Sequence, residues 1–196
     1  MKTLVNSRLV LFAMLAFFSC SKENIQRPVT NETPADNLYN KPAGGFFIGQ
    51  SYGGGIIFYI DNSGQHGLIT ATADQGTGIS WRNGSNVVTD ATGTAVGDGK
   101  SNTNKIVNAQ GKTGTYAAYL CYKYKNDGFK DWYLPSKDEL DLLYDQRNVV
   151  GGFGATDYWS SSESSKGKAW EQEFGGGFQF KYNKSLFFCI GFVFFR

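Results

Sequence analysis

"DWYLPSKDEL", residues 131–140, is the densest group of carboxylates in the chain and indicates how the middle of the fold is built. Ser136 and Glu139 stand in the S-x-x-E spacing of a capping box, in which each side chain accepts a hydrogen bond from the other residue's amide. Asp138 falls in the first helical turn, where the helix dipole favours an anion, and Leu140 begins an apolar stripe. The acids therefore predict the start of a helix.

Strand and helix patterns alternate with loops on the N-terminal side of this helix. Residues 56–60 and 68–71 predict the two strands of a hairpin, because the "DNSGQH" between them is rich in turn formers. Residues 82–101 predict a long loop, which in a compact domain is usually either functional or disordered. Two short helices are predicted next, at 102–111 and 113–125, the first closed by a glycine.

The last part of the chain has the period-two pattern of β-strands. Strand-like segments cover 157–164, 168–174, 178–183 and 186–195. Phe178, Phe180 and Tyr182 fall on one face of the third segment, and the final segment is apolar on both faces, which favours a central strand. Strands, then helices, then more strands predict an α+β domain with a mainly antiparallel sheet.

The first 20 residues have the layout of a bacterial lipoprotein signal peptide. Lys2 and Arg8 precede an apolar stretch at 9–18, and Ser19 then precedes Cys20. The apolar stretch is too short to span a bilayer, which needs about 20 residues. This layout is similar to a lipobox, in which the cysteine receives lipid; the alternative is ordinary cleavage near Ser19. We expect an outer-membrane lipoprotein of the cell envelope, with the cell surface as one destination.

Composition separates a tether from one domain. Residues 21–44 are polar and hold three of the four prolines, which predicts a flexible tether, whereas residues 45–196 form a single domain. Without the two bases of the signal peptide, 17 bases balance 17 acids. A neutral chain without a basic tract gives no electrostatic support for nucleic-acid binding.

Few residues could perform catalysis or bind a metal ion. The only histidine, His66, lies in the predicted hairpin turn, and no serine stands in a G-x-S-x-G motif. Asp90, Asp98 and Asn102 could hold calcium only irregularly, because their loop lacks the bidentate glutamate of an EF-hand. We therefore expect no metal ion and no other cofactor.

Two further cysteines, Cys121 and Cys189, lie in the predicted domain. In an oxidising compartment they could form one disulfide. The alternative is two buried thiols that act as small apolar side chains. Their spacing does not choose between the two.

Three tryptophans lie next to polar residues, as in "SWRNGSN", "YWSSSES" and "KAWEQEF". Such neighbours are typical of a surface that stacks a ring on a sugar, although the same rings could fill the core. The candidate ligand-binding residues are Trp81, Arg82, Asn83, Trp159, Glu163, Trp170 and Lys184.

The motifs "IGQSYGGGIIFYID…GLI", "DWYLPSKDEL", "YWSSSE", "AW…F" and "YNKS" occur in an order that resembles the domain at the C-terminus of collagen-like bacterial adhesins. The resemblance covers residues 46–190. It implies a C-type-lectin-like fold with two or three helices flanking the sheet, surface attachment, and binding of a polysaccharide. Gly191 and Phe194 stand where this family usually has arginines, so the contacts those arginines would make are not implied here.

Three classes of function follow. The leading hypothesis is a non-enzymatic envelope domain that binds a glycan or a surface protein. The second is an enzyme on the same fold, such as one of the formylglycine-generating kind, which would need a reactive cysteine or an acid/base pair that includes Asp131 or Asp141. The third is a subunit of a surface assembly that pairs its apolar C-terminal strand with a partner.

Overall fold

The computed structural model describes residues 45–190 and 193–195, with side chains up to Leu186. The signal peptide, the tether and Cys20 lie outside these residues. In chain order the elements are β1 (Ser51–Tyr52), β2 (Gly55–Ile60), β3 (Gly67–Ala71), β4 (Gly76–Ser80), α1 (Asp98–Gln110), α2 (Ala117–Lys123), α3 (Lys137–Asp145), α4 (Arg147–Val150), β5 (Asp157–Ser165), β6 (Lys168–Glu173), β7 (Gln179–Asn183), β8 (Phe187–Ile190) and β9 (Val193–Phe195). The predicted α+β class is confirmed.

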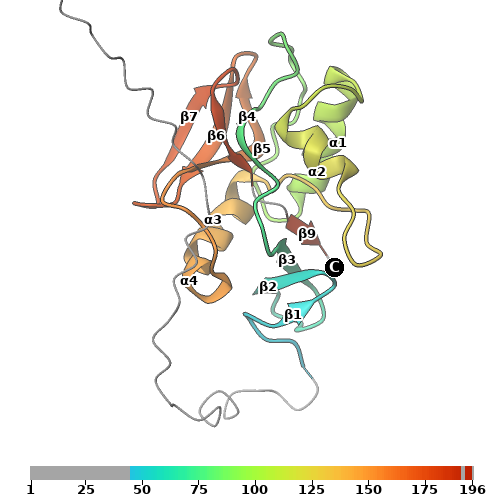
Figure 1. Ribbon diagram of the computed structural model, residues 1–196, viewed down its shortest axis with the longest axis vertical. Coiled ribbons are helices and arrows are strands. Elements are labelled where there is room, and N and C mark those ends of the chain that lie inside the picture. The colour runs from blue at the N-terminus through green and yellow to red at the C-terminus, as the bar shows by residue number, and fades with distance from the viewer. Residues whose placement is uncertain (1–44, 191–192, 196) are drawn as a thin grey trace, which may run out of the picture.

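The strands form two sheets, with the orders β1-β2-β3-β9 and β4-β8-β5-β6-β7. All pairs are antiparallel except β5 with β8. The final segment, predicted as one central strand, is instead two strands in different sheets: β8 is internal, whereas β9 is an edge. Figure 1 shows α1 and α2 beside the larger sheet and α3 between the two sheets, where it contacts β2, β5 and β6.

Helix α3 begins at the predicted capping box. The Ser136 hydroxyl accepts from the Glu139 amide at 3.3 Å, and the Glu139 carboxylate accepts from the Ser136 amide at 2.7 Å. Helix α1 begins four residues earlier than predicted, and its last turn is closed by the Gly111 amide, which donates to the Val107 carbonyl at 2.9 Å. The one-turn α4 had no sequence signal.

The stretch before α3 joins two hydrophobic clusters. Trp132 and Leu134 pack in the cluster that surrounds Ile106 of α1. Tyr133, between them, packs in the cluster that contains Leu140 of α3. Alternate residues of one extended segment thus enter different clusters, which fixes α3 between the sheets. In the part of the chain that the structure describes, no helix has the length and apolar character needed to cross a membrane.

The capping box also fixes the end of the long loop before α1. The buried Glu139 carboxylate accepts from the Gly97 amide at 2.8 Å, and the Ser136 hydroxyl donates to the Ala95 carbonyl at 2.8 Å. A Cβ at Gly99 would contact the Glu139 carboxylate and would lie 2.6 Å from the Tyr133 ring. Only glycine therefore allows the first turn of α1 to approach α3 this closely.

Candidate ligand-binding site

Two of the candidate ligand-binding residues, Glu163 and Lys184, form a buried ion pair. Both side chains are almost completely buried. The Lys184 ammonium also donates to the carbonyls of Val87 at 3.2 Å and Lys166 at 3.1 Å, so each of its three donors has an acceptor. Burial lowers the pKa of Lys184, while Glu163 opposes that shift. Because of these internal contacts, the Lys184 ammonium has no free donor for a ligand.

The same ion pair holds the long loop at its middle. The Glu163 carboxylate accepts from the amides of Thr89, at 3.1 and 3.0 Å, and Asp90, at 3.0 Å. In addition, the Glu163 amide donates to the carbonyl of Ala91 at 2.7 Å. The loop predicted to be functional or disordered is thus ordered, because a buried carboxylate from β5 replaces the sheet partners that its backbone lacks.

Trp81 and Trp159 are also buried, with 1% and 0% of their surface exposed. Their indole N–H groups donate to the carbonyls of Ser160 at 2.8 Å and Ile79 at 3.0 Å. The Lys184 ammonium lies 4.3 Å from the centroid of the Trp81 ring. Protein therefore covers the ring faces that ligand stacking would need, and this favours the alternative in which both rings fill the core.

Arg82 and Asn83, the polar neighbours of Trp81, are partly buried. The Asn83 side chain donates to the carbonyls of Gln110 at 3.0 Å and Thr113 at 3.1 Å, and so ties the loop to the end of α1. The Arg82 amide donates to the Lys184 carbonyl at 3.3 Å. The structure gives Asn83 a structural task.

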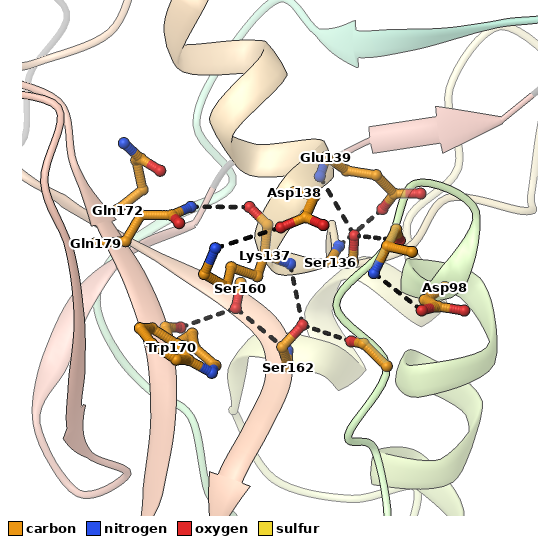
Figure 2. A network of polar contacts seen from close by, with 12 residues as sticks. Asp98, Ser136, Lys137, Asp138, Glu139, Ser160, Ser162, Trp170, Gln172 and Gln179 are labelled. Carbon is orange, nitrogen blue, oxygen red and sulfur yellow. Dashed lines mark hydrogen bonds and ion pairs between the residues drawn. The ribbon is translucent and has the colours of Figure 1, made fainter.

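Trp170 is the one candidate tryptophan that is only partly buried. The ammonium groups of Lys137 and Lys181 lie 5.3 and 4.7 Å from the centroid of its ring. Gln179 donates to the Lys137 carbonyl at 2.9 Å and brings a second polar side chain to the same face (Figure 2). The indole N–H of Trp170 makes no hydrogen bond to any residue that the structure describes. We call Trp170, Lys137, Lys181 and Gln179 the Trp170 site.

A buried network of serines positions the backbone under this site. Ser160 donates to the Trp170 carbonyl at 2.9 Å, and its oxygen accepts from the Ser162 amide at 3.2 Å. Ser162 accepts from the Lys137 amide at 3.0 Å and donates to the Gly93 carbonyl at 2.7 Å (Figure 2). Hydrogen bonds in a low-dielectric interior reinforce one another, so the strand that carries Trp170 and the helix that carries Lys137 are held in fixed relation.

Two acids border the Trp170 site on α3. The Asp138 carboxylate lies 3.3 Å from the Lys137 ammonium, in a partly exposed ion pair. Asp141 is exposed, and its pKa is raised by partial desolvation and by the nearby Asp145, while Lys137 opposes the shift. The site therefore presents cations over the ring and carboxylates at its edge, a mixture suited to an amphipathic ligand with several hydroxyl groups.

The opposite face of β7 carries a row of exposed aromatic rings. Phe178, Phe180 and Tyr182 expose 64, 47 and 40% of their surface. The ring centroids lie 6.1 Å apart in each neighbouring pair. The period-two pattern predicted that these rings share a face, but such a pattern does not say whether that face is buried or exposed.

Glu171, next to Trp170 on β6, is a buried acid without a partner. Its side chain is 1% exposed, and neither carboxylate oxygen has a hydrogen bond. Desolvation raises its pKa to about 8, and the carboxylates of Asp157 and Glu173 add to the rise; the nearby Phe180 amide opposes it without reaching hydrogen-bond geometry. Glu171 is therefore largely protonated and neutral at pH 7, which avoids a buried negative charge.

Of the residues considered for catalysis, one is a buried thiol and two are exposed acids. Cys121 is a free and buried thiol on α2, and desolvation raises its pKa well above the ordinary value, which disfavours the thiolate. The side chain of Cys189 lies outside the described residues. Asp131 is exposed, with its carboxylate 3.6 Å from the Lys100 ammonium, and Asp141 is exposed on α3.

His66 lies in the turn between β2 and β3, as predicted, and is exposed. It borders a cavity of about 270 Å³ between the hairpin and the start of the domain. The other lining residues are Phe46, Tyr52, Ile57, Ile60, Gln65, Gly67, Leu68 and Ile69. This lining is mostly apolar, and the carboxylate of Asp61, which is not part of it, accepts from the His66 amide at 3.4 Å.

The residues considered for irregular calcium binding take part in the fold instead. Asn102 is buried and donates to the Gly93 carbonyl at 2.6 Å, and the Asp98 carboxylate accepts from the Ala95 amide at 3.0 Å. Asp90 is exposed. Over the described ranges, no group of three or more histidine, cysteine, aspartate or glutamate side chains could hold a metal ion.

Comparison with protein families agrees with the motif order. The model of the Lcl C-terminal domain family matches residues 70–193, and the chain belongs to this family. The match begins in β3 and ends in β9, so it includes the larger sheet and the Trp170 site, whereas β1 and β2 of the smaller sheet precede it. A comparison with curated proteins gave no match. Family membership supports a surface-associated domain.

Proposed function

We propose that this domain is a non-enzymatic binding domain of the bacterial cell envelope and that it binds a glycan, free or on a surface protein, at the Trp170 site. The observation that carries the proposal is a partly exposed indole with an N–H open to a ligand, bordered by two ammonium groups, an amide and two carboxylates. A sugar ring can stack its C–H face on this indole when the exposed Lys181 side chain, which lies over the ring, moves aside. The hydroxyl groups of the sugar need donors and acceptors at the ring's edge. The Trp170 site has both.

The geometry favours binding at this place over the other candidate residues. Trp81, Trp159 and Lys184 are buried and hydrogen-bonded internally, so a ligand would have to open the core to reach them. The serine network under Trp170 lowers the conformational entropy that a ligand would otherwise have to remove. Trp170 therefore combines access with a preorganised backbone.

A glycan array probed with the purified protein, followed by titration of the best ligand, tests the proposal. We expect Trp170→Ala to weaken binding by at least about tenfold, because a loss of 1.4 kcal/mol corresponds to that factor. Tyr122→Ala is the matched control, since Tyr122 is a partly exposed ring with the Lys112 ammonium 5.1 Å from its centroid. Equal binding by both variants, or no binding to any glycan, would remove the basis of the proposal.

We also propose that the protein is anchored in the outer membrane through lipid on Cys20. The support is the signal layout and the polar tether described above. Fractionation of cells that produce the full chain should place the wild-type protein with the outer membrane. Cys20→Ser should release it from that fraction. An unchanged distribution of the variant would contradict lipid anchoring.

A further inference from the structure

Strand β7 is an open edge of the larger sheet. It pairs with β6 on one side, and no other strand among the described residues pairs with it (Figure 1). The Glu173 amide donates to the Phe178 carbonyl at 2.9 Å, so the backbone of Phe178 points toward β6. Because the direction alternates along an antiparallel strand, the backbone groups of Gln179 and Lys181 point out of the sheet.

This edge lacks the usual protection against pairing. Open edges are normally blunted by charged side chains, proline or bulges. Here the only charged side chain on β7 is Lys181, and its ammonium lies over the Trp170 ring, 4.7 Å from the centroid. The other face of β7 carries the exposed rings of Phe178, Phe180 and Tyr182. Main-chain donors and acceptors and a row of apolar rings are therefore presented together.

We propose that β7 pairs antiparallel with β7 of a second copy of this chain, around a twofold axis at Phe180, so that the two five-stranded sheets become one continuous sheet. The sequence of the strand is complementary to itself in this register. Phe180 lies opposite the partner's Phe180, and Phe178 lies opposite the partner's Tyr182. Every exposed ring of the row thus meets another ring across the axis, on the same face of the joined sheet.

The backbone and the charges select this register. With the axis at Phe180, Gln179 lies opposite the partner's Lys181, and the backbone groups of both residues point toward each other. Moving the axis to Lys181 would place two lysines directly opposite, which is unfavourable. Moving it to Gln179 would leave Tyr182 opposite the partner's Gly176. The register at Phe180 alone pairs all three rings and avoids opposed lysines.

Pairing would also join two Trp170 sites, a consequence that rests on the proposed function although the pairing itself does not. Trp170 lies on β6, one strand in from the junction, and on the face opposite the aromatic row. Three strand spacings, roughly 14 Å at about 4.8 Å per strand, would separate the two indoles across the strands, and an offset of two residues would add about 7 Å along them. Both sites would face the same side of the joined sheet, so one extended glycan could contact both.

Sedimentation velocity of the purified protein over a range of concentrations tests the pairing. We expect a concentration-dependent dimer for the wild-type chain and a monomer for Phe180→Lys, because the new lysine lies opposite itself across the axis. Val88→Lys is the control, since Val88 is a loop residue with 55% of its surface exposed. A wild-type protein that stays monomeric at high concentration, or a dimer that survives Phe180→Lys, overturns the proposal. A monomer that still binds glycans would separate this failure from failure of the proposed function.

Cysteine cross-linking tests the register. Phe180→Cys places a cysteine opposite itself in a pair without main-chain hydrogen bonds, where Cβ atoms approach to about 4.5 Å, the upper end of the separation that a disulfide spans. We expect this variant to form a covalent dimer under mild oxidation at least tenfold faster than Tyr182→Cys, whose cysteine would lie opposite Phe178. The parent protein, with its own cysteines, gives the background rate. Equal rates for the two variants would exclude the axis at Phe180.

Discussion

Replacing the unpartnered acid, in Glu171→Gln, should stabilise the protein at neutral and alkaline pH. In the folded protein the pKa of Glu171 is raised to about 8, mainly by desolvation, from an ordinary value of 4.5. Between these two values the folded state binds more protons than the unfolded state. The free energy of unfolding must therefore fall as pH rises from about 4.5 to about 8, and then level off. Glutamine has the same shape and cannot ionise, so the variant should lose this pH dependence.

The size of the effect follows from the difference of 3.5 between 4.5 and about 8. At about 1.4 kcal/mol per pKa unit, roughly 5 kcal/mol of stability is lost across this range. The buried amide of glutamine retains the unmet hydrogen bonds of the protonated acid, so the two proteins should have similar stability at pH 5. At pH 8.5 we expect Glu171→Gln to be more stable than the wild type by about 2–5 kcal/mol.

Urea unfolding followed by tryptophan fluorescence at pH 5, 7 and 8.5 measures these free energies. Glu163→Gln is the matched control, because Glu163 is an equally buried glutamate on the neighbouring strand but has Lys184 as its partner. Loss of the Glu163 carboxylate leaves the buried Lys184 ammonium without its counter-ion and should destabilise the protein by about 3–5 kcal/mol. A wild-type stability that rises from pH 5 to 8.5, or a Glu171→Gln variant less stable than the wild type at pH 8.5, would refute the reasoning.

Three further predictions concern the contacts that hold the long loop. Adding Lys184→Met to Glu163→Gln should restore part of the stability lost in the single variant, because the unpaired charge is removed; urea unfolding that shows further loss would contradict this. Ser136→Ala should cost about 1 kcal/mol in thermal unfolding through loss of the helix cap, and no change would show that the cap contributes nothing. Gly99→Ala should cost about 1–3 kcal/mol through overlap with Glu139, and unchanged stability would mean that α1 can move away.

Local patterns predicted the fold well because local interactions build it. The capping box needs only Ser136 and Glu139, three residues apart, and both hydrogen bonds are present. The hairpin at 56–71 and the strands after residue 156 follow from turn chemistry and period-two alternation. The split of the final segment into β8 and β9 could not be predicted in this way. The one local signal for two strands is Gly191, because a glycine inside a strand pattern often marks a bend or a bulge.

The site was harder to predict because burial depends on partners distant in sequence. Three tryptophans with similar polar neighbours gave the same local signal. The structure separates them, since Trp81 and Trp159 find backbone acceptors 79 and 80 residues away. The sequence predicted Lys184 and Glu163 as ligand-binding residues at the surface. The structure shows that they form an ion pair inside the protein, although they lie 21 residues apart in the chain. A pattern of neighbouring residues cannot specify contacts between residues that are so far apart in the sequence.

The motifs that predicted the family contain both residues that hold the fold and residues that are proposed to bind a ligand. Ser136, Glu139, Glu163 and Lys184 stand in the motifs, and all four are buried in hydrogen bonds that fix the long loop and α3. Such residues preserve a fold whatever the ligand is. Specificity has to come from exposed groups around the accessible indole of Trp170. Trp170, Lys137 and Tyr182 stand in the motifs, whereas Gln179, Phe180 and Lys181 of β7 lie outside them. A chain of this family with the same motifs and different residues at 178–181 should keep the fold and bind a different ligand. Exchange of residues 178–181 alone would show this by changing glycan preference without changing thermal stability.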